Sequence, residues 1–378
     1  MRNVDAAGLG IGDDYPPRIM GVLNVSRESP YEPSVFADPG EAAAYVDAEL
    51  VGEGADIVDV GLESANKRFE VLSAEEELDR LDTAVAAMES VSGDAVFSIE
   101  TRYHEVAAAA LDAGFDMVND ICGFADPEMP RVCAEYDAAV VKMASPPDLT
   151  RPGAVESVDD IYDALRRDGL TEKTIVDPAF GGWSEEKTLE DDRETFRRLR
   201  EFRGLGRPIL VSINRKNFLR DVAGRSTEAA LPVSLAATSM AVERGAHVVR
   251  THDVAETRDA ALVGDAFARD RLAVDGTDPT VSELDVTTPA ELRRHVDRVG
   301  GDAATADRGV VRVFELDGLT VADRDALVAA AEDTDVTVTG DASLLLFGTP
   351  ESLSTFVSTV DGVSTDLDAA LDAVAGVC

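Results

Sequence analysis

A set of mostly polar residues stands at or just after the ends of short apolar segments in the first 250 residues of the sequence. They are Asn24, Asp59, Glu63, Glu100, Asn119, Met143, Asp177, Asn214, Lys216, Arg250 and His252. Such segments are typical of buried parallel strands, and the carboxyl ends of these strands meet at one edge of a sheet or barrel. Polar groups gathered there lose hydration, which is costly unless they serve a ligand. We therefore expect them to line one binding site.

The residue types within this set indicate what the ligand is like. Two carboxylates, an amide and an ammonium come from the middle of the set, namely Glu100, Asn119, Asp177 and Lys216. They can match the donors and acceptors along the edge of a planar, nitrogen-rich ring. Arg250 and His252 lie two positions apart on one side of a strand and suit a phosphate or another anionic leaving group. Asn24 offers an oxygen to a phosphate-bound Mg²⁺.

Eight strands that alternate with helices are expected to position these residues. The expected strands cover residues 18–25, 57–61, 95–101, 117–120, 138–143, 174–178, 208–214 and 247–252. Amphipathic segments separate them. The segment after the second strand begins with Ser73 and Glu76, which have the spacing of a capping box. Eight such units over about 250 residues predict a (β/α)₈ TIM barrel of the α/β class. A doubly wound open sheet is the alternative, but no glycine-rich dinucleotide loop follows the first strand.

The chain is expected to divide into three parts. Residues 1–17 form an N-terminal tail, and residues 18–272 form the barrel domain. A turn-rich stretch follows, and residues 283–378 then form a small α/β domain of unknown role. This last part carries no catalytic constellation, so a structural or oligomeric role is its default interpretation.

The charge of the chain excludes several functions. Its 378 residues include 74 Asp and Glu against 35 Lys and Arg, which gives a net charge of −39. Such a field repels nucleic acid and anionic membrane surfaces. A cytoplasm with molar salt screens this self-repulsion, so the composition predicts a halophilic host. The three cysteines form no disulfide framework and indicate a reducing, cytoplasmic compartment.

The sequence resembles the dihydropteroate synthase family, and seven motifs in the family's order carry the resemblance. They are IMGVLNVS (19–26), GADIVDVGLES (54–64), FSIET (97–101), NDICGFADPEM (119–129), IVDPAFG (175–181), ILVSINRKNF (209–218) and VVRTHDVAETRDA (248–260). The resemblance implies a pterin-binding barrel that condenses 6-hydroxymethyl-7,8-dihydropterin diphosphate with 4-aminobenzoate or a related arylamine. Pyrophosphate leaves in the presence of Mg²⁺, and a homodimer through the last barrel helices is also implied.

The matching motifs assign a role to each candidate residue. Those implied to bind the substrates are Glu63, Ser64, Glu100, Asn119, Met143, Asp177, Asn214 and Lys216. The residues implied to bind the diphosphate are Asn24, Arg250 and His252, and Asn24 is also the implied metal ligand. Lys216, Arg250 and His252 are the implied catalytic residues, because the departure of the diphosphate is the difficult step.

Several positions depart from the family pattern and keep other functions open. Ala65 and Asn66 replace the family's Thr and Arg, and Glu100 and Asn214 replace an Asp and a Ser. The residues between Ser26 and Ser34 and the Gly182-Trp183 pair also differ. The pterin side is thus retained while the arylamine side is altered. A pterin-dependent methyltransferase and a non-catalytic pterin-binding accessory protein remain as alternatives.

Overall fold

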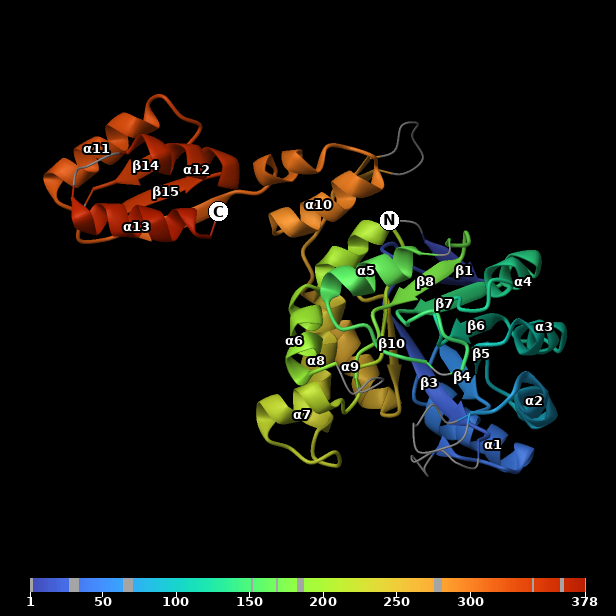
Figure 1. Cartoon of the computed structure of the whole chain (residues 1–378). Helices are drawn as coiled ribbons and strands as arrows, with labels where there is room; N and C mark the ends of the chain where they lie inside the picture. Colours follow the sequence, from blue (N-terminus) through green and yellow to red (C-terminus); the bar gives the residue numbers. More distant parts are fainter. Residues whose placement is uncertain are drawn as a thin grey trace. The chain divides into compact units, whose positions relative to one another are not determined.

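The computed structural model shows two compact units, and the chain passes from one to the other between Glu283 and Leu284 (Figure 1). The residues that the structure describes are 3–26, 34–63, 71–150, 152–167, 169–181, 187–274, 281–341, 343–360 and 364–377. Each unit is considered by itself. Among the described residues, no helix is both long enough and apolar enough to span a membrane.

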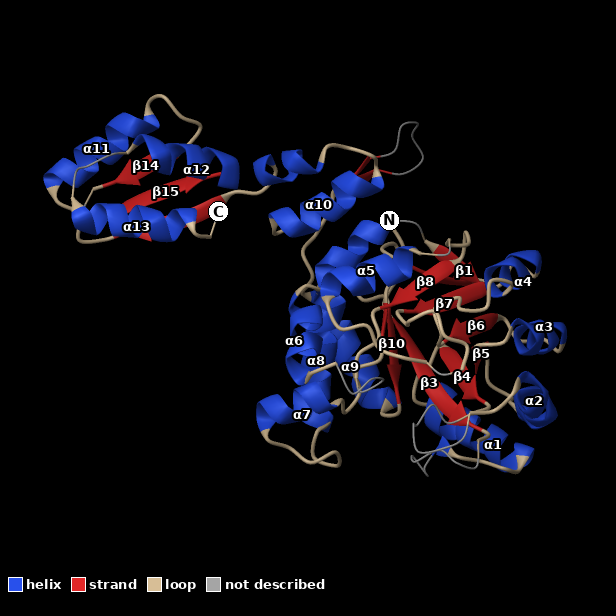
Figure 2. Ribbon diagram, viewed as in Figure 1, coloured by secondary structure: helices blue, strands red, loops and turns tan. Residues whose placement is uncertain are grey.

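Eight parallel strands form the centre of the first unit (Figure 2). They are β3 (Arg18–Asn24), β4 (Ile57–Gly61), β5 (Val96–Thr101), β6 (Met117–Asp120), β7 (Ala139–Met143), β8 (Thr174–Asp177), β9 (Leu210–Val211) and β10 (Val248–Thr251). Their order is β8-β7-β6-β5-β4-β3-β10-β9, and a parallel bridge from Val176 to Ile209 joins the two ends of the sheet. The expected TIM barrel is therefore confirmed. Strand β9 is much shorter than the expected 208–214, because only two of its residues pair in a ladder.

Helices cover the outside of the barrel (Figure 2). They are α1 (Pro39–Tyr45) with the π-helical turn η2 (Val46–Val51), α2 (Ala74–Ser90), α3 (His104–Asp112), α4 (Met129–Glu135), α5 (Val158–Arg166), α6 (Leu189–Arg197) with the 3₁₀ segment η3 (Leu199–Leu205), α7 (Asn217–Ala223), α8 (Leu231–Glu243) and α9 (Val254–Ala266). Ser73 and Glu76 form the expected capping box at the start of α2. Thr188 and Asp191 form another at the start of α6. These caps fix where each helix leaves its loop.

The N-terminal segment is a β-hairpin, which corrects the expected tail. Strands β1 (Val4–Ala6) and β2 (Leu9–Ile11) pair antiparallel. Val4, Ala6 and Ile11 are buried against side chains from the barrel interior, among them Met20 and Val248 at strand starts. The hairpin therefore closes the amino-terminal end of the barrel.

A partly buried ion cluster around Asp13 secures this hairpin. Its carboxylate accepts hydrogen bonds from Nη2 of Arg203 at 2.9 and 3.0 Å. Nη2 of Arg271 and Nε2 of His247 each lie 3.2 Å from Asp13 Oδ1. Burial opposes the charge on Asp13, but His247 and the two arginines outweigh burial and lower the pKa of this carboxyl. The cluster is fully satisfied within the protein.

The second unit combines a three-stranded antiparallel sheet with helices. Its elements are α10 (Pro289–Arg298), the 3₁₀ segment η4 (Ala303–Arg308), β13 (Arg312–Leu316), α11 (Val321–Ala331), β14 (Thr337–Gly340), β15 (Leu344–Gly348), α12 (Pro350–Thr359) and α13 (Thr365–Ala375). The strand order is β13-β15-β14. One sheet face, which includes Leu346, packs with Leu327, Phe356 and Leu371 of α11, α12 and α13. Helix α13 was absent from the sequence prediction. Strands β11 (Ala273–Val274) and β12 (Val281–Ser282) pair in the stretch before this unit.

Candidate active site

A pocket opens at the carboxyl ends of the barrel strands, where TIM barrels carry their active sites. Its lining comes from strands β5 to β10 and the loops that follow them, and consists of Glu100, Asn119, Ile121, Met143, Asp177, Ala179, Phe180, Ser212, Lys216 and Arg250. Six of the residues singled out in the sequence are thus brought together. The first and last of them, Glu100 and Arg250, are 150 positions apart in the chain, so the barrel fold brings the group together.

Asp59 of β4 is the centre of the polar network below this pocket. Its carboxylate is fully buried and accepts hydrogen bonds from Ser98 Oγ at 2.9 Å and Asn119 Nδ2 at 3.0 Å. It also accepts one from Arg250 Nε at 2.7 Å. Because a carboxylate only accepts, the amide nitrogen of Asn119 must face Asp59, and its Oδ1 is left as an acceptor for a ligand. The sequence analysis placed Asp59 among the strand ends but gave it no role.

Arg250 joins Asp59 to Glu100 across the barrel. Its Nη2 donates to Glu100 Oε2 at 2.7 Å. Burial raises the pKa of Glu100 to about 7, although Arg250 beside it favours the ionised form. Burial also opposes the charge of Arg250, but Glu100 and Asp59 outweigh this effect and raise its pKa. Arg250 therefore stays charged, and its Nη1 takes no part in these two bonds.

Asp177 and Lys216 form the opposite wall of the pocket. Asp177 Oδ1 accepts a hydrogen bond from the backbone nitrogen of Ala179 at 2.8 Å. Burial raises the pKa of Asp177 to about 6 against the effect of this bond and of Lys216. Burial lowers the pKa of Lys216, and Asp177 counteracts it. Burial thus disfavours the charged forms of both groups, and a ligand that forms hydrogen bonds with them can stabilise those charged forms.

The loop after β8 is shaped to admit the Lys216 side chain. Gly181 has a φ of +108°, and a Cβ atom built on it would lie 3.1 Å from both Cδ and Nζ of Lys216. Lys187 fixes the same loop, since its Nζ donates to Ala179 O at 2.9 Å and lies 3.2 Å from Asp192 Oδ1. Asp192 in turn accepts from the backbone nitrogen of Gly181. Sequence reasoning missed Lys187 and Asp192, although a buried lysine is notable in a chain with so few.

Three of the expected site residues, namely Asn24, Asn214 and Glu63, lie outside the pocket lining. Asn24 Nδ2 donates to Ser34 Oγ at 2.8 Å, and Asn214 Nδ2 donates to Asp253 Oδ2 at 2.9 Å. Glu63 pairs with the buried Arg102, which directly follows β5. These residues fix loops at the mouth, because a residue at a strand end can turn to its own loop as easily as to the barrel axis.

His252 is also outside the lining. Burial lowers the pKa of His252 to about 3, and the neighbouring charge of Arg250 lowers it as well. The imidazole is therefore neutral near pH 7 and can offer an anion only a neutral N–H donor.

The remaining altered positions lie outside the described residues. These are Ser64 among the site residues, with Glu28, Ala65, Asn66, Gly182 and Trp183 among the departures from the family pattern.

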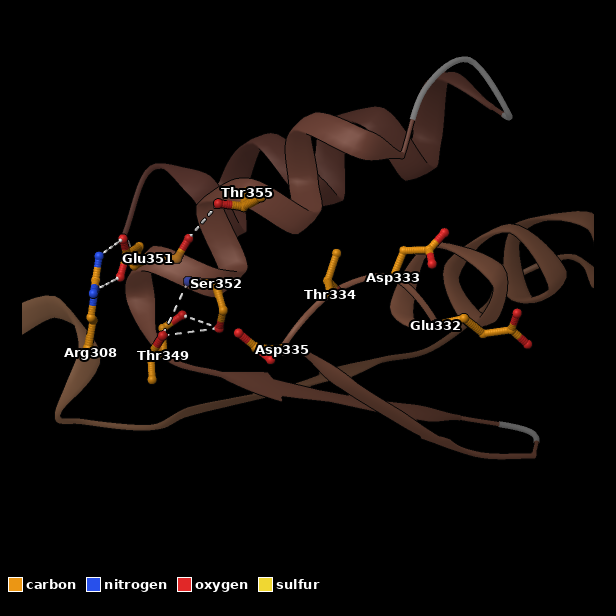
Figure 3. Close-up of a pocket in the computed structure, with 9 residues that line it drawn as sticks. All are labelled: Arg308, Glu332, Asp333, Thr334, Asp335, Thr349, Glu351, Ser352 and Thr355. Atoms are coloured by element: carbon orange, nitrogen blue, oxygen red, sulfur yellow. Dashed lines mark hydrogen bonds and ion pairs between the residues drawn. The ribbon is translucent and has the colours of Figure 1, made fainter.

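The second unit has a pocket of a different character, lined by Arg308, Glu332, Asp333, Thr334, Asp335, Thr349, Glu351, Ser352 and Thr355 (Figure 3). Arg308 and Glu351 face each other in an ion pair, with Nη2 and Oε1 2.8 Å apart. Thr349 Oγ1 accepts from the backbone nitrogen of Ser352 and caps α12. The described contacts in this pocket are thus an ion pair and a helix cap.

Comparisons with known proteins agree with this geometry. The family description "Pterin binding enzyme" matches residues 20–252. The chain is 35% identical over 268 residues to a probable bifunctional folylpolyglutamate synthase/dihydropteroate synthase of Haloferax volcanii, and this match covers 67% of the chain. It spans only 31% of that longer protein, and the same share of a Halobacterium salinarum protein with the same name. It is 31% identical to the dihydropteroate synthase of Streptococcus pyogenes serotype M3, with 65% of this chain and 93% of that protein covered.

Solved structures give the same result. The dihydropteroate synthase of Coxiella burnetii in complex with pteroic acid matches with a TM-score of 0.59 and 27% identity, covering 70% of this chain and 98% of that one. The Xanthomonas albilineans enzyme with 4-aminobenzoic acid matches with a TM-score of 0.60 and 30% identity, covering 70% of this chain and 97% of that one.

Proposed function

Because the chain belongs to the pterin-binding enzyme family, we propose that it is a dihydropteroate synthase. It would join 6-hydroxymethyl-7,8-dihydropterin diphosphate to 4-aminobenzoate and release pyrophosphate, a step of folate biosynthesis. The observation that carries the proposal is the pocket that gathers Glu100, Asn119, Asp177, Lys216 and Arg250. Relatives with this name and solved structures that hold pteroic acid or 4-aminobenzoate support it.

The pocket residues fit the edge of a pterin ring. Asn119 Oδ1 and the Asp177 carboxylate accept hydrogen bonds, as the amino and N–H groups of the ring require, while Lys216 Nζ donates to a ring oxygen or nitrogen. Met143 lies in the same lining and supplies an apolar contact. The donors and acceptors along one side of a flat ring can therefore each form a hydrogen bond with one of these residues.

The reaction exchanges one bond for another at the methylene carbon of the pterin. The bond from this carbon to the diphosphate oxygen breaks, and the oxygen keeps the electron pair. The bond to the amine nitrogen forms, and the nitrogen loses a proton. Arg250 stabilises the negative charge that grows on the diphosphate, and His252 contributes a neutral N–H. The rigid pocket holds the ring for attack along the line of departure.

Magnesium is part of this proposal. Asn24 uses its amide nitrogen on Ser34, which leaves Oδ1 as the one oxygen it can offer. A single protein oxygen fits Mg²⁺ that is bound mainly by phosphate oxygens and water. When bound, the ion would neutralise charge on the diphosphate.

A homodimer and a cytoplasmic location complete the proposal. Met240 of α8, Val263 of α9 and Phe267 directly after α9 are exposed, with Phe267 at 81% of its full accessible area. Helices α8 and α9 are packed closely, and Ser239 Oγ donates to Ala260 O between them. An apolar patch on such a rigid pair fits a second copy of the chain. The buried free thiols of Cys122 and Cys133 fit a reducing cytoplasm.

A turnover assay in molar KCl with Mg²⁺ tests the activity. It supplies the pterin diphosphate and 4-aminobenzoate to the full chain and measures both pyrophosphate and the condensed product. Lys216→Ala and Arg250→Ala should abolish product formation, whereas Arg131→Ala on the surface of α4 should not. Pterin binding without product from the unaltered chain would instead favour the accessory binding protein. Methyl transfer from a methylated pterin would favour the methyltransferase.

A further inference from the structure

A tight turn over residues 213–216 connects two residues of the pocket lining. Ser212 lines the pocket directly before the turn, and Lys216, the last residue of the turn, lines it as well. The backbone nitrogen of Lys216 donates to Ile213 O at 3.3 Å, which closes the turn. A change in the shape of the turn therefore moves the Lys216 side chain relative to the rest of the pocket.

Arg215, inside this turn, has an unfavourable backbone conformation. Its φ is +53°, in the left-handed region that glycine adopts far more readily than arginine. Position 215 is the third residue of the turn, where glycine or asparagine is usual when φ is positive. An arginine in this conformation costs free energy, and it persists only where its surroundings hold it in place.

Hydrogen bonds to three neighbouring segments hold Arg215. Its backbone nitrogen donates to Ser234 Oγ of α8 at 2.7 Å. The guanidinium meets both carboxylate oxygens of Asp253, with Nε and Nη2 each 2.8 Å from its acceptor. Nη1 donates to Thr227 O and to Glu228 O, both at 2.9 Å, in the stretch between α7 and α8. Such a set of bonds fixes both the backbone and the side chain of Arg215.

Asp253 is itself anchored to the end of β10. Its backbone nitrogen donates to Oγ1 of Thr251, a buried residue of that strand, at 3.0 Å. Burial opposes the charge of Asp253, but the hydrogen bonds from Arg215 and Asn214 outweigh burial and lower the pKa of this carboxyl. Asp253 therefore stays ionised, and it connects the turn to the strand that carries Arg250.

The guanidinium of Arg215 is directed to these loop contacts, and Arg215 lies outside the pocket lining. We propose that Arg215 is a positioning residue: it holds the turn in its left-handed conformation and thereby keeps Lys216 in the pocket wall. This inference rests on the proposed function, in which Lys216 binds the pterin. It adds a residue that acts on substrate affinity through the backbone and not through its own charge.

Variants at position 215 separate support of the backbone from charge. Arg215→Met removes the guanidinium but keeps a Cβ, which disfavours a positive φ. Arg215→Gly removes the whole side chain, yet glycine adopts a positive φ readily. Arg215→Lys keeps the charge without the planar fork that meets both oxygens of Asp253. The matched control is Arg193→Met, because Arg193 of α6 forms another arginine–aspartate pair with Asp221 of α7.

The measurements are the direct Kd for the pterin diphosphate, turnover with both substrates, and the melting temperature, all in molar KCl. We expect Arg215→Met to raise the Kd about tenfold, because the turn relaxes and displaces Lys216. Arg215→Gly should raise it only about twofold to threefold, although it removes more of the side chain. Arg215→Lys should resemble Arg215→Met, and Arg193→Met should leave the Kd unchanged within about twofold.

A milder variant keeps the test informative if Arg215→Met does not fold. Ser234→Ala removes only the acceptor of the Arg215 backbone nitrogen and leaves the guanidinium contacts in place. We expect it to raise the Kd about twofold to threefold, as for the loss of one neutral hydrogen bond.

Two results would overturn the inference. Equal losses of affinity in Arg215→Met and Arg215→Gly, with recovery in Arg215→Lys, would show that the guanidinium acts on the diphosphate through its charge. A lower melting temperature with an unchanged Kd in the Arg215 and Ser234 variants would make Arg215 a stability residue only.

Failure of the proposed function would give a different result. An unaltered chain that binds the pterin diphosphate but forms no product would refute the synthase activity, while the Kd values of the variants would still decide the role of Arg215. An unaltered chain that does not bind the pterin diphosphate would refute both.

Discussion

The two ends of the barrel both bury charged side chains, but they do so with opposite results. At the base, the Asp13 carboxylate meets Arg203, His247 and Arg271, and its pKa is lowered. At the mouth, Glu100 and Asp177 are buried with fewer partners, and their pKa values are raised to about 7 and about 6. At the base, other side chains of the protein pair with Asp13. At the mouth, we expect Glu100 and Asp177 to complete their hydrogen bonds only when a ligand binds. Buried charge therefore stabilises one end and prepares the other for binding.

The largest predicted effect on catalysis comes from replacing Asp59, the centre of the hydrogen-bond network at the mouth. Asp59→Ala removes the acceptor of Ser98, Asn119 and Arg250, so two pocket side chains lose their orientation together. We expect kcat/KM to fall about a hundredfold, as for the loss of charge-assisted hydrogen bonds. Steady-state kinetics with both substrates measures this change. Ser98→Ala removes a single one of the three bonds and should cost far less; an equal loss would contradict the central role of Asp59.

The base should respond in stability and not in catalysis. Asp13→Asn removes the charge that Arg203 and Arg271 face, and we expect the free energy of unfolding to fall by about 3 kcal/mol. Urea unfolding in molar KCl measures the fall. Turnover at a temperature where the variant is folded should match that of the unaltered chain. A loss of turnover in the folded variant would show that the two ends are coupled.

A smaller change at the mouth tests the fit of Lys216. Gly181→Ala places a methyl group 3.1 Å from Lys216 Nζ on a residue with φ +108°. The displaced ammonium should lower kcat/KM about tenfold. Gly169→Ala is the matched control, because Gly169 has φ +80° but nothing within 4 Å of an added Cβ. Similar losses from both variants would assign the effect to backbone strain alone.

The smallest predicted effect is a difference in the pH dependence of stability. The folded-state pKa of Glu100 lies above its unfolded value, so its contribution to stability is present below about pH 4.5 and is lost as the pH rises to about 7. The lowered pKa of Asp13 acts in the opposite direction, and its contribution is lost as the pH falls below 3.8. Glu100→Gln should therefore reduce the decline in unfolding free energy from pH 4.5 to 7. Denaturation at fixed KCl across this range measures it, and an unchanged slope would refute the assignment to Glu100.

The barrel could be predicted from the sequence because each buried parallel strand is a continuous apolar segment followed by a polar residue. The hairpin at residues 4–11 could not, since its strands are three residues each and their burial depends on distant barrel side chains such as Met20 and Val248. Helix α13 was missed in the same way, because its buried residues meet a sheet formed elsewhere in the chain.

In the candidate site, the predictable residues are again those whose position follows from the strand pattern. Glu100, Asn119 and Asp177 lie at strand ends and face the barrel axis, so their grouping follows from strand order and the twofold alternation of side chains. Asn24 and Asn214 also lie near strand ends, but Asn24 turns to Ser34 in the loop after β3 and Asn214 turns to Asp253 after β10. The geometry of the loops sets the direction of these two side chains, and a periodic pattern in the sequence carries no information about loop geometry.

The cluster around Asp13 also sets an order of events during folding. Its partners Arg203, His247 and Arg271 lie 190, 234 and 258 positions further along the chain. The hairpin therefore gains its anchors only after nearly the whole barrel sequence is present. Contacts between residues so far apart in the chain are closed late and slowly, because a large loop must first be ordered. Until then the apolar faces of Val4 and Ile11 stay uncovered, and the growing chain depends on its high negative charge to remain dispersed.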